Sequence, residues 1–279
     1  MLIRCWGSRG SIPVSGESYL KYGGDTTCLE IQAQSGDIIV VDAGTGIRRY
    51  GNLAAGNGPS KYNFIFTHAH WDHIMGFPFF KPLYFDRNHI HLHSCPFDRH
   101  FVEKILSKVM AEPYFPVAYA DIRAGINYEP VCRREFQIGS VSIRPIAISH
   151  PNGGSGYKFV ENGKSFVFLT DNELGFTHPG GHRYSDYVDL VSGADLLVHD
   201  AEYTTEEYSD FIGWGHSVYT DAIKLAAEAG CKTLGLFHLN QERTDAEMDR
   251  IVADSRRIIA AGDHPFECFG VGGDWEMAL

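Results

Sequence analysis

Short runs of apolar and β-branched residues recur along the whole chain, separated by turns that contain glycine or charged residues. Such runs are typical of β-strands. The run from Asp37 to Ala43 is almost continuously apolar, as expected of a strand that is covered on both faces. Together the runs predict strands near 2–6, 28–33, 37–43, 63–67, 140–148, 156–160, 165–170, 194–199, 233–238 and 266–271.

Helical spacing of apolar residues appears between these strands. The segment 217–229 has apolar residues at helical intervals, and 244–261 opens with Thr244 and Glu247 in the spacing of a capping box. Further helices are predicted near 46–55 and 97–111. The pattern predicts an α/β fold in which two mixed β-sheets pack face to face with helices outside, a four-layer αββα sandwich.

A middle stretch at about 77–135, rich in aromatic residues and containing proline, separates two similar halves. With 279 residues, 44% of them hydrophobic, the chain can bury one large core. We therefore predict a single domain, 1–279, with 77–135 as an insertion. Two interpretations of the insertion stay open: it covers the functional pocket, or it packs as a subdomain that does not contact the substrate.

The charge of the chain limits its partners. The formal net charge is −11, and no long Lys/Arg cluster is present that would follow a phosphate backbone. We therefore expect no extended nucleic acid as partner, whereas a small anionic substrate remains possible. No stretch has 18 apolar residues and no signal-peptide pattern opens the sequence, so we expect no membrane association and a cytoplasmic location. The six cysteines lack a CxxC pair and are expected to be buried or half-buried reduced thiols.

Candidate chemistry concentrates in one turn after the apolar run at 63–66. His68, His70, Asp72 and His73 place three imidazoles and one carboxylate within six positions. Imidazole suits Zn, Fe, Mn or Ni, and a carboxylate adds a hard oxygen ligand. His68 and His70 can converge on one metal ion, while Asp72 and His73 would face a second. A single ion, or a histidine-rich turn without metal, are the alternatives.

Three more polar residues stand where predicted strands end. His150 follows the strand at 142–149, Asp171 follows 165–170, and His238 follows 233–237. A strand end is where a core element presents a side chain to a site. Each of these residues alone is ambiguous, but with the turn at 68–73 they indicate a shared metal centre.

These residues, His68-x-His70-x-Asp72-His73 and then His150, Asp171 and His238, resemble the metallo-β-lactamase fold superfamily over essentially the whole chain. The resemblance implies that His68, His70 and His150 bind one ion, that Asp72, His73 and His238 bind the other, and that Asp171 bridges them. Ala69 occupies the middle of the motif, which resembles the hydrolytic members and not the flavodiiron oxygen reductases.

A narrower resemblance lies on the C-terminal side. The segments around His199-Asp200-Ala201-Glu202, Gly215-His216-Ser217 and Phe237-His238 are similar to those of the ribonuclease Z, cyclic-nucleotide phosphodiesterase and PhnP-type branch. By this resemblance His216 contacts the scissile phosphate or protonates the leaving oxygen, and Asp200 orients its imidazole. The sequence departs from the branch at Asp200, where Glu is usual, and at Val218, where Thr is common. It also lacks the basic Gly/Pro-rich arm of ribonuclease Z, which argues against tRNA processing.

The expected function is that of a dinuclear metal-dependent hydrolase, a phosphodiesterase acting on small phosphodiesters or cyclic nucleotides. Two divalent ions are expected, Zn before Mn or Fe, with a hydroxide shared between them as nucleophile. Asp72, His216 and Asp200 are the candidate catalytic residues. Two alternatives remain: a carboxyl-ester, thioester or lactone hydrolase using the same ions, and a non-catalytic metal-binding or scaffold protein. A homodimer is expected from the resemblance alone.

Four further features have weaker support. Asp42, at the end of a central strand, is a candidate acceptor for the N–H of a ligand imidazole, or else an ordinary turn carboxylate. The turn at 8–11 could approach an anionic substrate with its backbone or with Arg9, or it could be a plain turn. His89, His91 and His93 would share one strand face as a possible third metal site. The loop at 153–156 could offer backbone N–H groups to a phosphate.

Overall fold

Two mixed sheets of seven strands each form the centre of the computed structural model, which describes residues 1–56, 60–93, 99–129 and 134–279. The first sheet has the order β14 (Glu276–Ala278), β1 (Leu2–Gly7), β2 (Cys28–Gln32), β3 (Ile38–Val41), β4 (Lys61–Ile65), β5 (His89–His93), β6 (Gly125–Glu129). The second has the order β13 (Glu267–Gly270), β12 (Thr233–Phe237), β11 (Leu196–Asp200), β10 (Lys164–Leu169), β9 (Ser155–Glu161), β8 (Val141–Ala147), β7 (Phe136–Ile138).

The two sheets pack face to face because their central strands have apolar side chains on both faces. One face of each strand packs against the other sheet, and the opposite face packs against helices. In β10, Phe166 and Phe168 point into the layer between the sheets, while Val167 and Leu169 point to the outer face. The inner layer also contains Ile39 of the first sheet, and all these side chains are fully buried. A strand with two buried faces has a continuous apolar sequence, which explains why these strands could be recognised.

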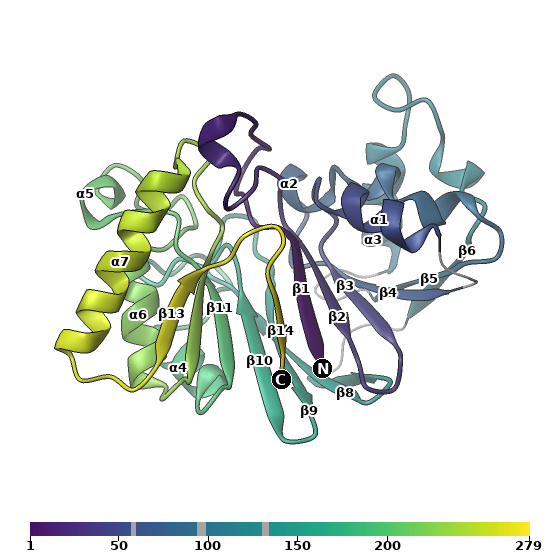
Figure 1. The fold of residues 1–279 in the computed structure, drawn as a ribbon. Coiled ribbons are helices and arrows are strands. Elements are labelled where there is room, and N and C mark those ends of the chain that lie inside the picture. The colour runs from purple at the N-terminus through teal and green to yellow at the C-terminus, as the bar shows by residue number, and fades with distance from the viewer. Residues whose placement is uncertain (57–59, 94–98, 130–133) are drawn as a thin grey trace.

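Helices cover the two outer faces (Figure 1). The second sheet is covered by α4 (Tyr184–Val191), α6 (Tyr219–Glu228) and α7 (Asp245–Ala261), and the first by α1 (Ile47–Ala54) and α3 (Arg99–Val109). The remaining helices are short: α2 (Trp71–Ile74), α5 (Thr205–Tyr208), and the 3-10 turns η1 (Glu17–Tyr19), η2 (Phe77–Phe79), η3 (Lys81–Tyr84) and η4 (Tyr119–Asp121). The predicted four-layer αββα sandwich is confirmed. No helix of the described ranges has both the length and the apolar composition needed to cross a bilayer.

All ten predicted strands are present, with their ends shifted by a few residues. The strands β6, β7 and β14 and the helix α4 were not predicted. β7 and β14 have only three residues each, too few to show a period. The stretch 77–135 was predicted as an insertion between two halves. In the structure it also forms β5 and β6, two strands of the first sheet. Four cysteines are free and buried, as expected, while Cys95 and Cys132 lie outside the described residues.

The parallel strands β3 and β4 of the first sheet and β10, β11 and β12 of the second end at one edge of the molecule. The short helix α2 lies at this edge, between the two sheets (Figure 1). The residues that follow each strand therefore meet there, from both halves of the chain.

Candidate metal centre

The turn after β4 brings its polar residues inward. Asp72 and His73 lie in α2 and are buried, as is His68, whereas Trp71 between them is 79% exposed. The N–H of His73 donates to the carbonyl of His70, which closes the turn. The helix α2 thus begins directly after His70. His70 before its start and His73 within it therefore face the same space between the sheets.

His68, His70, His150 and Asp171 form the first group of potential ligands, and their ligand atoms all lie within 4.8 Å of one another. His150 Nε2 is 3.0 Å from His70 Nδ1. Oδ2 of Asp171 is 3.5 Å from His68 Nε2 and 3.8 Å from His150 Nε2. Three imidazoles and one carboxylate oxygen thus converge on one point.

Asp72, His73 and His238 form the second group, again with Asp171. His73 Nε2 is 3.2 Å from Oδ1 of Asp171, and His238 Nε2 is 3.3 Å from its Oδ2. Asp72 Oδ2 lies 3.2 Å from both imidazoles. The structure therefore brings together all seven predicted ligands, and Asp171 is the residue that the two groups share.

In three of the histidines, the Nδ1 atom that points away from the site is held by an oxygen. His73 contacts Oδ2 of Asp42 at 2.8 Å and His238 contacts Oε2 of Glu202 at 2.9 Å. His150 Nδ1 donates to the carbonyl of Gly215 at 3.0 Å. Such contacts orient an imidazole so that its other nitrogen can bind a metal. Asp42 therefore occupies the position expected of it.

The electrostatics of the site fit a cation. Burial lowers the pKa of His68 well below its usual value, and lowers that of His150 to about 3, so both imidazoles are neutral and have a free lone pair. Nε2 of His68 is buried and has no hydrogen-bond partner among the described residues. Buried polar atoms are rarely left without a partner. Burial lowers the pKa of His73 and of His238 too, but the carboxylates around them outweigh burial and raise the pKa of both imidazoles, so a metal ion would replace their protons as the partner of these carboxylates. Imidazoles and buried carboxylates facing one small space are a donor set suited to divalent metal ions.

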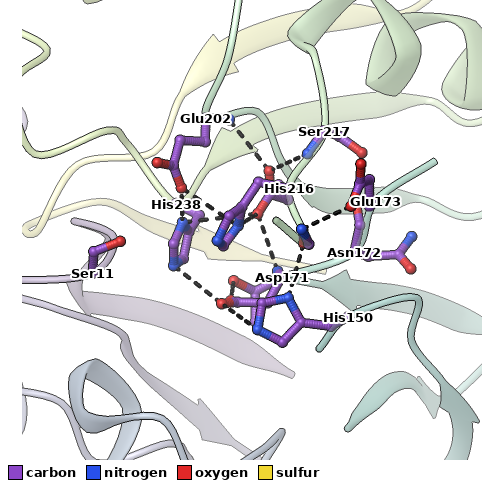
Figure 2. Close-up of polar contacts among 12 residues, drawn as sticks. Ser11, His150, Asp171, Asn172, Glu173, Glu202, His216, Ser217 and His238 are labelled. Carbon is purple, nitrogen blue, oxygen red and sulfur yellow. Dashed lines mark hydrogen bonds and ion pairs between the residues drawn. The ribbon is translucent and has the colours of Figure 1, made fainter. Parts of the chain in front are cut away.

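His216 and Asp200 lie beside the second group. His216 Nδ1 is 2.8 Å from Oδ2 of Asp200, and its ring stacks on that of His238 with centroids 4.5 Å apart (Figure 2). The other oxygen of Asp200 accepts from the N–H of Ser217 at 2.9 Å. Burial lowers the pKa of His216, but the charges of Glu202 and Asp200 outweigh it and raise that pKa to about 9. The shorter side chain of Asp200 therefore does reach His216.

Two carboxylates of the site were missed in the sequence. Glu202 contacts His238 and also lies 3.4 Å from His216 Nδ1. Glu173 is buried and accepts from His178 and from the backbone N–H of Gly213 and Gly215. Glu202 stands two residues after Asp200, and Glu173 stands two residues after Asp171. This position next to predicted site residues could have indicated both carboxylates.

Three weaker expectations have different outcomes. Arg9 is buried and donates to the carbonyls of Gly23, Asn240 and Arg243, so its guanidinium is bound within the fold, while an approach of the backbone at 8–11 to a substrate stays a prediction. In β5, His91 contacts Glu129 and His93 contacts Asn63. Within the described part of the chain, no group of potential metal ligands includes these histidines. A role of the loop at 153–156 in binding phosphate stays a prediction.

The backbone is strained at the centre. Ser11, Asp42, Asp171 and His238 have φ between 52° and 62°, in the left-handed region that residues other than glycine seldom adopt. All four contribute atoms to the site, Ser11 through its backbone N–H, which donates to Oδ2 of Asp72 at 2.9 Å. Local strain of this kind persists where the surrounding structure holds it, and it is concentrated at functional sites.

Comparisons with known proteins agree with this geometry. A family model described as a beta-lactamase superfamily domain matches residues 38–239. The chain is 24% identical over 268 residues to ribonuclease Z of Haloarcula marismortui, covering 80% of this chain and 83% of that protein. A diphosphatase of the PhnP family has a similar structure, with a TM-score of 0.70, 18% identity and coverage of 100% of this chain and 97% of that one. Human tRNase Z, short form, gives a TM-score of 0.66 at 15% identity and covers 100% and 99% of the two chains.

Proposed function

The chain belongs to the beta-lactamase superfamily and is a metal-dependent hydrolase, and we propose that it cleaves small phosphodiesters, including cyclic nucleotides, at a centre for two divalent ions. His68, His70 and His150 would hold one ion, and Asp72, His73 and His238 the other, with Asp171 between them. Zn²⁺ fits this donor set best, and Mn²⁺ or Fe²⁺ are the alternatives. When bound, two such ions lower the pKa of water and draw charge from phosphoryl oxygens.

The observation that carries the phosphodiester assignment is the pair of His216 and Asp200. Asp200 holds Nδ1 of His216, so Nε2 is the atom left to meet a substrate. When protonated, this imidazole is a cation with a second N–H at Nε2. A cation placed there can contact a phosphoryl oxygen and give its proton to the leaving oxygen. Asp200 is then a positioning residue, and Asp72 contributes to catalysis as one of the residues that would hold the second ion.

The alternative within the same chemistry is RNA processing, which the name of the curated relatives favours. The net charge of −11 argues for small substrates instead, because contacts with an extended backbone need clustered basic side chains. Carboxyl-ester, thioester and lactone hydrolysis remain the other alternative, since the same donor set serves either electrophile.

A substrate panel tests the proposal. The protein is assayed with Zn²⁺ and Mn²⁺ on bis-p-nitrophenyl phosphate, on 2′,3′- and 3′,5′-cyclic nucleotides, on a precursor tRNA, on a lactone and on a thioester. We expect cleavage of the small phosphodiesters and little of the others. Asp171→Ala should abolish it, His216→Ala should lower kcat about 100-fold or more, and His182→Ala, a change of a half-exposed surface histidine, should have no effect.

Two results would count against the proposal. If His216→Ala stays within about threefold of the wild type while Asp171→Ala is inactive, His216 has no role in phosphodiester cleavage. If the purified protein holds fewer than about 0.5 ions per chain and no metal restores activity, a non-catalytic protein is favoured.

A further inference from the structure

A cavity of about 310 Å³ lies beside the proposed centre. Three of its lining residues also belong to that centre: Glu202 and His216, and Ser11, whose backbone N–H donates to Oδ2 of Asp72 at 2.9 Å. Ser11 comes from the first half of the chain, and it approaches His238 from the side away from Ser217 (Figure 2). The cavity is therefore continuous with the place where a substrate of His216 would react.

One wall of the cavity is aromatic. Tyr203 and Phe211 stack with centroids 4.9 Å apart and planes at 5°, and Phe211 meets Trp214 edge to face at 5.3 Å. Trp214 is 61% exposed although it lines the cavity. Tyr203 in turn lies 6.1 Å from the ring of His216. A planar group that enters the cavity can thus stack on exposed aromatic surface.

The other wall consists of hydrogen-bond acceptors. Oε1 of Gln241 is buried without a hydrogen-bond partner in the described part of the chain. Glu242 is exposed beside it, and the carboxylate of Glu207 is held by Arg243 at 2.6 Å. Among the described residues that line the cavity there is neither Lys nor Arg. The exposed Glu242 therefore offers carboxylate oxygens to a ligand that brings N–H groups, and the unpartnered amide oxygen of Gln241 becomes a second acceptor when its side chain turns to the ligand. The carboxylates of this wall repel a second phosphate.

We propose that this cavity binds the nucleobase of a nucleoside phosphodiester, preferably a base with an exocyclic amino group, while its phosphate lies at the metal centre. The inference rests on the proposed function and specifies its substrate class. The volume is at the lower end for small-molecule sites, enough for one nucleoside and not for an oligonucleotide. The stacking wall accepts any base, and the acceptor wall selects for the amino group, as in cytosine or adenine.

The test compares 2′,3′-cyclic phosphates of cytidine, of uridine and of methyl riboside, which has no base. We expect kcat/KM to fall in that order, by about tenfold or more between cytidine and methyl riboside. Trp214→Ala should lower kcat/KM for cytidine about tenfold relative to that for methyl riboside, and Trp214→Phe should restore most of it. Gln241→Leu should reduce the preference for cytidine over uridine. Ile212→Ala, which changes a 55% exposed residue of the same loop outside the cavity, is the matched control and should leave the ratios unchanged.

Different results would refute the base site and the proposed phosphodiesterase activity. If methyl riboside 2′,3′-cyclic phosphate is cleaved as well as the cytidine compound, or if Trp214→Ala lowers both equally, the base site is refuted while phosphodiester cleavage stands. If no phosphodiester is cleaved, the proposed function fails. Calorimetry then decides the base site separately, because cytidine 3′-monophosphate should bind the metal-loaded protein more tightly than ribose 3-phosphate, and equal affinities refute it.

Discussion

The carbonyl oxygen of Gly215 accepts a hydrogen bond from Nδ1 of His150, a proposed metal ligand that lies 65 positions earlier in the chain. Gly215 has φ of 99°, which favours glycine, and a Cβ built there would lie 2.0 Å from that same Nδ1. The loop at 208–215 thus touches the centre through a position that admits no side chain.

Gly215→Ala should therefore displace His150 and weaken metal binding about 10- to 100-fold. The measurement is competition for Zn²⁺ against a chromophoric chelator, together with kcat/KM on a phosphodiester. Gly213→Ala is the matched control, because Gly213 also has positive φ, at 85°, but its Cβ would meet nothing within 4 Å. Equal Zn²⁺ affinities of the two variants would show that the close approach to His150 is unimportant.

Glu173 fastens this loop to the second sheet. Its carboxylate accepts from Tyr208 and from the N–H groups of Gly213 and Gly215, each at 2.7 Å. An amide in its place offers only one acceptor oxygen and turns its NH₂ group toward these donors. Glu173→Gln should therefore lower the free energy of unfolding by about 2–3 kcal/mol and speed hydrogen exchange at Gly213 and Gly215.

Denaturant unfolding and exchange mass spectrometry measure both effects of the Glu173 variant. Glu206→Gln, at an exposed carboxylate of α5, serves as its control. An exchange pattern of Glu173→Gln indistinguishable from that control would exclude an anchoring role.

A substitution at Asp42 would show whether this residue orients the imidazole of His73. The two oxygens of Asp42 accept from the backbone N–H and the hydroxyl of Thr67 at 2.7 and 2.6 Å, and Oδ2 also contacts His73 Nδ1. Asn tolerates the left-handed backbone at this position, so Asp42→Asn changes charge and proton placement with little distortion. We expect Zn²⁺ affinity to fall about 10- to 100-fold at one of two sites. Titration calorimetry checks this, with Asp37→Asn, before the start of β3, as the control. Two unchanged binding steps would contradict the role given to Asp42.

The ion pairs of Asp195, far from the metal centre, should make the stability of the protein depend on pH. Burial raises the pKa of Asp195, but Lys232, the N–H of Ser165 and Lys164 outweigh burial and lower that pKa to about 2. Since this value lies below the usual 3.8, the ionised carboxylate stabilises the fold above about pH 4, and this contribution is lost as the pH falls toward 2. Both lysines are more than half exposed, so the contribution is small.

Asp195→Asn should cost about 1 kcal/mol at pH 7, and the difference from the wild type should vanish near pH 2. Unfolding by urea at several pH values measures it, and Asp210→Asn, at an exposed carboxylate, should show no such trend. A difference that is constant with pH would show that the ion pairs contribute nothing.

Local sequence was sufficient to recognise ten of the fourteen strands in the described part of the chain and all seven candidate ligands. A strand buried on both faces must be apolar along its length, so a histidine or aspartate at its end stands out, as at His150, Asp171 and His238. The turn at 68–73 shows its four polar residues directly. Glu173 and Glu202 did not stand out, because a carboxylate after a strand is ordinary, and its importance depends on partners elsewhere in the chain.

Burial of each strand constrains its own residues, so the order of residues along the chain was enough to indicate which chemical groups stand at the strand ends. Which of these groups meet depends on the tertiary structure. Asp72 and His238 are 166 positions apart, and their contact exists because two sheets from different parts of the chain pack with the same edge aligned. The cavity beside His216 has the same origin, since Ser11 and Trp214 reach it from opposite parts of the chain. Contacts of this kind depend on the packing of whole layers, which no local pattern encodes.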